Sequence, residues 1–274
     1  EPIKEPTPLV LVTSSPHMHC GLTIGKSMRE VMLALVPAII ASVYYFRMSA
    51  AIVMVTCVVS AIVFETICNK VMHKPNTVQD GSAALTGLLL AMCLPASMPP
   101  LFAAMGSMFA IVVGKAVFGG LGCNIFNPAH IGRAILLASF PQQMTNWVLP
   151  ATAAASDAVS TATPLAVMRA TEKIWQAGGA ASAAKLPDLM NLFWGNVGGS
   201  LGETCVPALV LGGLYLIYKK LIDWRIPVFY LVTVAILTGV YGAVMGYPST
   251  FPLYHLFAGG LMIGAFFMAT DWVT

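Results

Sequence analysis

Long apolar stretches recur along this chain and constrain its fold more than any other feature. A helix needs about 20 mostly apolar residues to cross a bilayer core of about 30 Å. Eight segments approach or meet that requirement, at residues 28–46, 48–68, 81–98, 101–118, 128–149, 200–218, 226–247 and 253–270. The pattern predicts an all-α polytopic membrane protein, a helical bundle with eight spans.

The composition excludes the soluble alternatives. Of the 274 residues, 58% are hydrophobic and 9% are charged, whereas a soluble domain is about 45–50% apolar and about 25% charged. So few charged side chains cannot coat a water-exposed surface, which argues against a soluble enzyme and a disordered tail. The net charge of +3 is too small to indicate a nucleic-acid partner. Membrane lipid is the predicted surrounding.

The positions of Lys and Arg predict the orientation. With the N-terminus in the cytoplasm, ten of the fourteen basic residues fall in cytoplasmic loops, and four fall outside, namely Arg47, Arg169, Lys173 and Lys185. Cytoplasmic loops are enriched in Lys and Arg. Residues 1–27 are therefore predicted to form a cytoplasmic tail and residues 150–199 an extracytoplasmic loop. No basic stretch followed by an apolar one opens the chain, so we expect no cleavable signal peptide.

Two similar tetrapeptides indicate an internal repeat. Ser27-Met-Arg-Glu30 and Ser200-Leu-Gly-Glu203 both match the S-x-x-E capping box that precedes a helix. Five spans separate them, and an odd number of spans inverts the second unit in the membrane, as in many transporters. The prediction is an inverted repeat, with five spans in residues 28–149 and three in residues 200–274. The second repeat then looks truncated.

Thr163 begins the one predicted helix of the long loop. Thr163 is placed as the N-cap and Pro164 as the first helical residue, with the helix running to about Gln176. The residues allow two interpretations. Thr163 is a helix cap only, or the N–H groups and dipole at the helix start also favour a phosphate there.

Resemblance to a known family favours the second interpretation. Ser160-Thr161-Ala162-Thr163 resembles the signature at which flavin mononucleotide (FMN) is joined to threonine through a phosphoester bond. Four longer runs, starting at Asp80, Phe118, Asn191 and His255, together resemble RnfD, a membrane protein of the Rnf complexes. The same family contains NqrB, its counterpart in the sodium-pumping NADH:quinone oxidoreductase. The resemblance covers essentially the whole chain.

The resemblance implies a function. Family members are flavoproteins of the bacterial inner membrane that belong to ion-translocating electron-transport complexes, and Rnf is a ferredoxin:NAD⁺ oxidoreductase that moves Na⁺ or H⁺. We therefore expect covalent FMN on Thr163, at the extracytoplasmic face, and no catalytic residue in this chain, because a separate flavin transferase makes the bond. The expected partners are the other membrane, flavin-bearing and iron–sulfur subunits. Family members usually have ten spans and continue past the final residues 269–274, ATDWVT.

Asn124 and Asn127 form a second candidate site, in the segment GGLGCNIFNP. Asn127 precedes Pro128 and is a natural N-cap. Glycines let a ligand approach the backbone, and amide side chains complement the edge of a flavin ring. In NqrB this stretch is associated with noncovalent riboflavin, so both asparagines are candidate riboflavin contacts, beside the simpler structural interpretation.

The other polar residues carry no site prediction. Glu65 and Lys115 lie near span ends, where long side chains reach the membrane surface. His17, His19 and Cys20 make a poor metal-ligand set, so no metal site is expected.

Three alternative functions stay open at this point. The first is the NqrB role in the quinone reductase, the second is a non-redox channel or transporter built on an inverted repeat, and the third is a purely structural anchor for redox partners.

Overall fold

The computed structural model describes residues 23–74, 77–151, 162–176, 188–203 and 205–271. Within these ranges the chain forms helices and loops without a β-strand, apart from one isolated antiparallel bridge between Pro95 and Ser200. The all-α prediction is confirmed. Most of the predicted tail, including the segment from His17 to Cys20, lies outside the described residues, as do Ser160 and Thr161.

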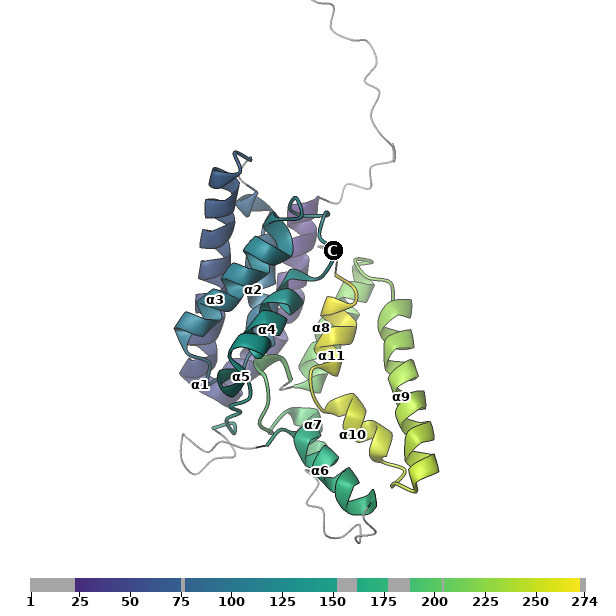
Figure 1. Cartoon of the computed structure of the whole chain (residues 1–274). Coiled ribbons are helices and arrows are strands. Elements are labelled where there is room, and N and C mark those ends of the chain that lie inside the picture. The colour runs from purple at the N-terminus through teal and green to yellow at the C-terminus, as the bar shows by residue number, and fades with distance from the viewer. Residues whose placement is uncertain (1–22, 75–76, 152–161, 177–187, 204, 272–274) are drawn as a thin grey trace, which may run out of the picture.

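The described helices form an elongated bundle (Figure 1). They are α1 (Ile24–Val71), α2 (Ser82–Met92), α3 (Pro100–Ile111), α4 (Pro128–Ser139), α5 (Pro141–Met144), α6 (Pro164–Gln176), α7 (Leu189–Trp194), α8 (Val206–Tyr218), α9 (Arg225–Met245), α10 (Phe251–Phe257) and α11 (Leu261–Ile263). Short 3₁₀ segments are η1 (Val78–Asp80) and η4 (Leu201–Glu203), and π-helical segments are η2 (Val112–Ala116) and η5 (Gly264–Met268).

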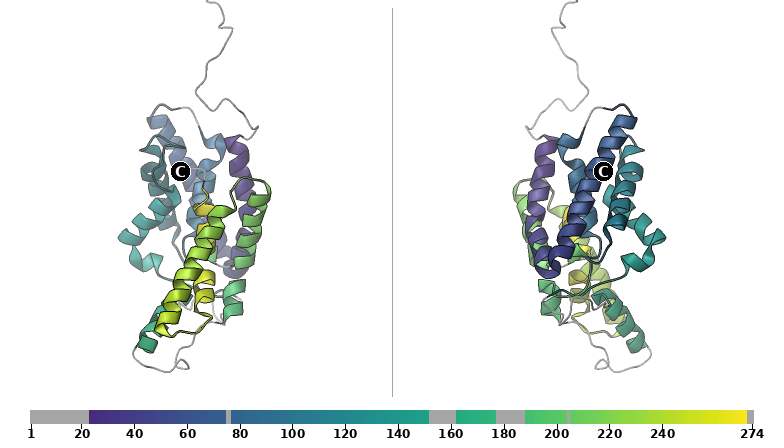
Figure 2. Two further views of the ribbon diagram at one scale, coloured as in Figure 1. Left: turned by 90° about the vertical axis from the view of Figure 1, so that its right-hand side faces the viewer. Right: turned by 90° about the vertical axis from the view of Figure 1, so that its left-hand side faces the viewer.

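Helix α1 contains the first two predicted spans. Its helical geometry breaks at Arg47, with φ 52° and ψ −134°, and the chain turns back there so that the two halves run side by side (Figure 2). Each half, residues 24–46 and residues 48–71, exceeds the roughly 20 residues that a span needs. The predicted boundary at residue 47 is therefore confirmed.

The first predicted capping box does not form, and the second forms in part. Helix α1 begins at Ile24 with Thr23 as its N-cap, and the Glu30 carboxylate accepts a 2.5 Å hydrogen bond from Tyr215 Oη rather than capping Ser27. In the second tetrapeptide the Glu203 carboxylate accepts hydrogen bonds from the Ser200 hydroxyl and N–H, as the glutamate of a capping box does. The helix that follows is only the 3₁₀ turn η4, and α8 begins at Val206. The prediction is therefore wrong for Ser27, because Thr23 caps α1, and for Ser200 only in that the long helix starts later, at Val206. The inverted repeat itself stays a prediction.

Three predicted spans are not continuous helices. Helix α2 ends at Met92, before a segment that contains Pro95 and Pro99, and α4 ends at Ser139, before Pro141. Proline lacks the N–H that continues a helix. The last span is bent by 66° between α10 and α11–η5. By length and composition, α1 and α9 are able to cross a membrane, and this bent pair counts as a third candidate.

The core lies where α1 packs against α2, α3 and α8. Its fully buried side chains include Leu35 of α1 and Leu85 and Leu90 of α2. Helices α6, α7 and α10 lie at the end of the bundle opposite the start of α1 (Figure 1). The predicted loop that carries Thr163 is therefore placed far from the N-terminal end of the first span.

Glycine makes the close contact between α1 and α8. A Cβ atom on Gly212 would lie 2.1 Å from the Ala34 carbonyl oxygen, whereas one on Gly239 of α9 would lie 3.7 Å from Pro252 Cγ. We expect Gly212→Ala to destabilise the fold by about 1–3 kcal/mol, because the helices must move apart. Gly239→Ala is the matched control and should leave thermal stability unchanged or raised. Equal melting temperatures for the two variants would contradict this packing.

Candidate functional site

Thr163 caps α6 as the sequence predicts. Its Oγ1 accepts a 3.2 Å hydrogen bond from the Ala166 N–H, and its carbonyl oxygen accepts a 3.0 Å bond from the Val167 N–H. The helix starts at Pro164 and ends at Gln176, and both bounds agree with the prediction. The Thr163 side chain is partly exposed, so its hydroxyl is accessible at the helix start.

A cavity of about 320 Å³ opens beside Thr163. Two cationic side chains, Arg169 and Lys173, line it together with the threonine. Side chains on a helix lean toward its N-terminus, so both cations lean toward the Thr163 end. The structure therefore brings together a hydroxyl, a helix start and two positive charges.

The opposite face of α6 holds the helix in place. Pro164, Met168 and Thr171 are buried, and their spacing places them on one side of the helix. Glu172 adds a longer contact, with its Oε1 3.9 Å from His255 Nε2 of α10. The exposed face is thereby directed toward the cavity.

The helix also adjoins a larger cavity. Leu165 lines it at one side, and the cavity of about 630 Å³ reaches His130 and Arg133 of α4 and Tyr230 of α9. No sequence pattern associates these residues, because α4 and α9 are distant in the chain and only the packing brings them to one space.

Asn127 has the structural role that its position before Pro128 suggests. Its Oδ1 accepts hydrogen bonds from the N–H groups of Ala129 and His130 at 2.9 and 3.4 Å. Its Nδ2 donates a 2.6 Å bond to Asp271 Oδ2. The N-cap prediction is confirmed, and most of the amide's hydrogen-bonding capacity is already used.

Asn124 is buried in the preceding loop. Gly119, Gly120 and Gly122 in this loop have positive φ angles of 123°, 110° and 82°, which favour glycine. Gly119 and Gly120 line a cavity of about 350 Å³, but neither asparagine lines it. The structure thus places the glycines and the asparagines of this segment in different surroundings.

The same cavity contains a buried ion pair. Lys115 Nζ lies 2.8 Å from Glu65 Oε1, and each side chain is 4% exposed. The expectation that both side chains reach the membrane surface is wrong. Lys115 belongs to the π-helical segment η2, whose wider turn changes the face on which side chains lie, and it is directed to α1 instead.

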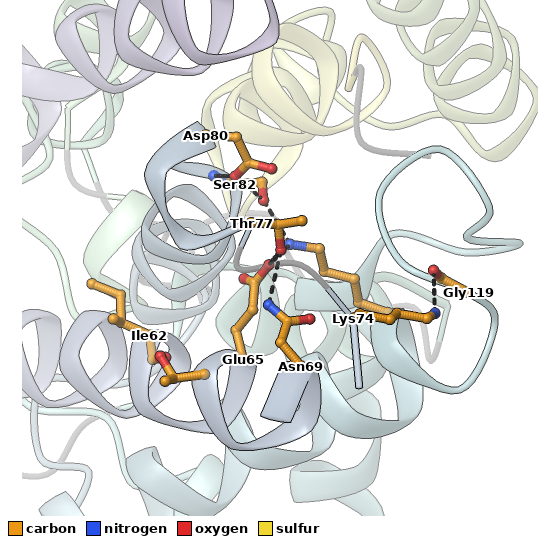
Figure 3. A network of polar contacts seen from close by, with 10 residues as sticks. Ile62, Glu65, Asn69, Lys74, Thr77, Asp80, Ser82 and Gly119 are labelled. Carbon is orange, nitrogen blue, oxygen red and sulfur yellow. Dashed lines mark hydrogen bonds and ion pairs between the residues drawn. The ribbon is translucent and has the colours of Figure 1, made fainter. Parts of the chain in front are cut away.

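Hydrogen bonds extend this pair into a chain of polar groups, part of which Figure 3 shows. Lys115 Nζ also donates to Ser82 Oγ at 2.6 Å, and Ser82 Oγ donates to Asp80 Oδ1 at 2.6 Å. On the other side Thr77 Oγ1 donates to Glu65 Oε1 at 2.7 Å. The available sequence signal was the presence of Glu65 and Lys115 inside apolar spans, where ionisable groups mark functional sites.

Comparison with known proteins identifies the family. Residues 11–274 match the family described as NQR2, RnfD, RnfE. The chain is 48% identical to the D subunit of the proton-translocating ferredoxin:NAD(+) oxidoreductase complex of Clostridium ljungdahlii, over 96% of this chain and 78% of that protein. It is 42% identical to the D subunit of the Na(+)-translocating ferredoxin:NAD(+) oxidoreductase complex of Acetobacterium woodii, over 96% and 77%.

A third relative is less similar in sequence, but the match covers about the same share of each chain. The D subunit of the ion-translocating oxidoreductase complex of Rhodobacter capsulatus is 39% identical, over 95% of this chain and 78% of that protein. Since these matches extend over nearly the whole chain, it belongs to the NQR2, RnfD, RnfE family.

Proposed function

We propose that this protein is the RnfD component of an Rnf-type complex, an ion-translocating ferredoxin:NAD⁺ oxidoreductase of the bacterial inner membrane. In this proposal it relays electrons through FMN attached to Thr163 and takes part in coupling electron transfer to Na⁺ or H⁺ movement. The names of its relatives support the complex. The observation that supports the flavin is the accessible Thr163 hydroxyl beside a cavity with two cations.

The residues around Thr163 fit a phosphoester. A phosphate that joins FMN to a threonine keeps a negative charge, and the positive end of a helix favours such a charge. Arg169 and Lys173 add two positive charges on the same cavity. When bound, FMN supplies one- and two-electron redox chemistry, while the residues of this chain hold and orient its phosphate.

Attachment requires no catalytic group here, because a flavin transferase would form the bond. The other membrane, flavin-bearing and iron–sulfur subunits would deliver and remove electrons. Helix α6, which Thr163 caps, and the start of α1 lie at opposite ends of the bundle (Figure 1), which agrees with a cytoplasmic N-terminus and an extracytoplasmic flavin.

Two alternative functions, the quinone-reductase role and a non-redox transporter, have less support. The family includes quinone-reductase proteins, but each relative named above is the D subunit of its complex. The 66° bend between α10 and α11 resembles the broken helices of transporters and is compatible with ion movement in a redox complex.

We expect one FMN on the tryptic peptide that comprises residues 134–169, when the protein comes from a host with the flavin transferase. Mass spectrometry with fragmentation locates the added mass. Thr163→Val should abolish it, because the acceptor hydroxyl is removed. Thr152→Val, in the same peptide but outside the attachment signature, is the control and should keep it. An unmodified wild-type peptide from a host that flavinylates other proteins would refute the redox assignment.

Arg169 and Lys173 should promote attachment by attracting the anionic flavin substrate. The double variant Arg169→Gln/Lys173→Gln should be flavinylated about two- to fivefold more slowly at low salt, since an exposed charge contact contributes about 0–1 kcal/mol. High salt should reduce the difference because it screens these charges. Lys219→Gln/Lys220→Gln, at the far end of α8, loses the same charge and serves as the control. A salt-independent difference would contradict the electrostatic explanation.

A second, noncovalent flavin near the glycine-rich loop is also part of the proposal, with Asn124 as its contact. We expect denaturation to release riboflavin from the wild-type protein and not from Asn124→Leu. Asn127→Ala should instead lower the melting temperature, because loss of an N-cap costs about 0.5–2 kcal/mol. Release of riboflavin from Asn124→Leu in wild-type amount would exclude this contact.

A further inference from the structure

One oxygen of the buried Glu65 carboxylate has no hydrogen-bond partner. Glu65 Oε1 accepts from both Thr77 and Lys115, whereas Oε2 is buried and has no partner within the part of the chain that the structure describes. The side chain is 4% exposed and lines the cavity of about 350 Å³. A buried carboxylate oxygen in this state is costly unless a ligand satisfies it.

The charges of the hydrogen-bonded chain do not balance. It contains two carboxylates, Glu65 and Asp80, and one ammonium, Lys115. The second lysine on the cavity, Lys74, is exposed, and its Nζ donates to the Gly119 carbonyl oxygen at 2.7 Å. The connected polar groups therefore carry one net negative charge, shared by the buried Glu65 and the half-buried Asp80, and charge that is removed from water is unfavourable unless it is paired.

The cavity wall offers the atoms that a small cation needs. Asn69, Thr77 and Asp80 line it with Glu65, and all four carry side-chain oxygens. Hard cations prefer oxygen ligands. A single positive charge neutralises the network, whereas a divalent ion would leave an excess positive charge beside Lys115.

We propose that this cavity binds one monovalent alkali cation, with Glu65 Oε2 as its anchoring ligand. The site lies where α1, η1 and η2 meet, at the end of the bundle opposite helix α6 (Figure 1). It extends the proposed role in ion movement by naming a binding site, and the binding can be measured without flavin or electron transfer. Absence of flavin at Thr163 would therefore not contradict cation binding, and absence of cation binding would not contradict flavin attachment.

Thermal unfolding of the full chain in lipid nanodiscs tests the site. The melting temperature (Tm) is measured in NaCl and in choline chloride at equal ionic strength and pH, because choline is too large for a small-cation site. We expect Tm to rise only with Na⁺, by roughly 2–4 °C for each fivefold increase above the dissociation constant. Equal Tm values in the two salts would overturn the proposal.

The double variant Glu65→Gln/Lys115→Met locates the effect. It removes both charges of the pair together, so no single buried charge is left behind, and it should lose the Na⁺-dependent shift. Glu30→Gln is the matched control, since that carboxylate is also on α1, in the half before the break at Arg47, and contacts Tyr215 and Lys219 outside the cavity. This control should keep the shift. Persistence of the shift in the double variant would place the cation elsewhere and overturn the proposal.

A second measurement does not depend on how the double variant folds. Broadening of the ²³Na resonance by wild-type protein reports bound Na⁺ directly, and Thr77→Val keeps the ion pair while removing one wall oxygen. We expect broadening with wild-type protein and a weaker effect with Thr77→Val. Broadening that is the same for both proteins would contradict the assigned ligand set.

Discussion

Pairing of buried non-helical backbone holds this bundle together. In a membrane environment every buried backbone polar group needs a partner within the protein. After α2 the chain leaves the helical conformation, and the Leu94 carbonyl oxygen accepts a 3.0 Å hydrogen bond from the Leu201 N–H. The Leu201 carbonyl oxygen in turn accepts a 2.6 Å bond from Ser42 Oγ of α1. These two contacts join the first helices of the chain to the segment that leads into α8, and both leucines are fully buried.

Because this non-helical backbone is hydrogen-bonded within the protein, helices too short to cross a bilayer can occur in the bundle. Helix α2 is too short to cross a bilayer, yet the segment that follows it finds its partners in protein rather than in lipid. The chain is also non-helical at the bend between α10 and α11, near Gly259, which has φ 72°. Irregular backbone at such positions occurs where it is buried in protein or lines a cavity. Accordingly, residues 258–260 line the largest cavity described above.

The need of buried polar groups for partners within the protein also governs where the charged side chains lie. At one end Arg169 and Lys173 are exposed on α6 and line the cavity beside Thr163. At the other end Lys115 is buried, and its charge is compensated by Glu65 and by a hydrogen bond to Ser82. A buried pair of this kind is retained only when its remaining hydrogen bonds are satisfied. The single unsatisfied oxygen of Glu65 is therefore the feature that points to a ligand.

The sequence by itself determined the all-α membrane fold, the break at Arg47, the start and end of α6, and the caps at Thr163 and Asn127. These follow from local hydrophobicity and from residues that act on their immediate neighbours. It also contained the flavin-attachment motif, which stays a prediction. Only the tertiary structure decided that Ser200 pairs with Pro95, and that Lys115 meets Glu65. Such contacts join residues far apart in the chain, so no local pattern encodes them.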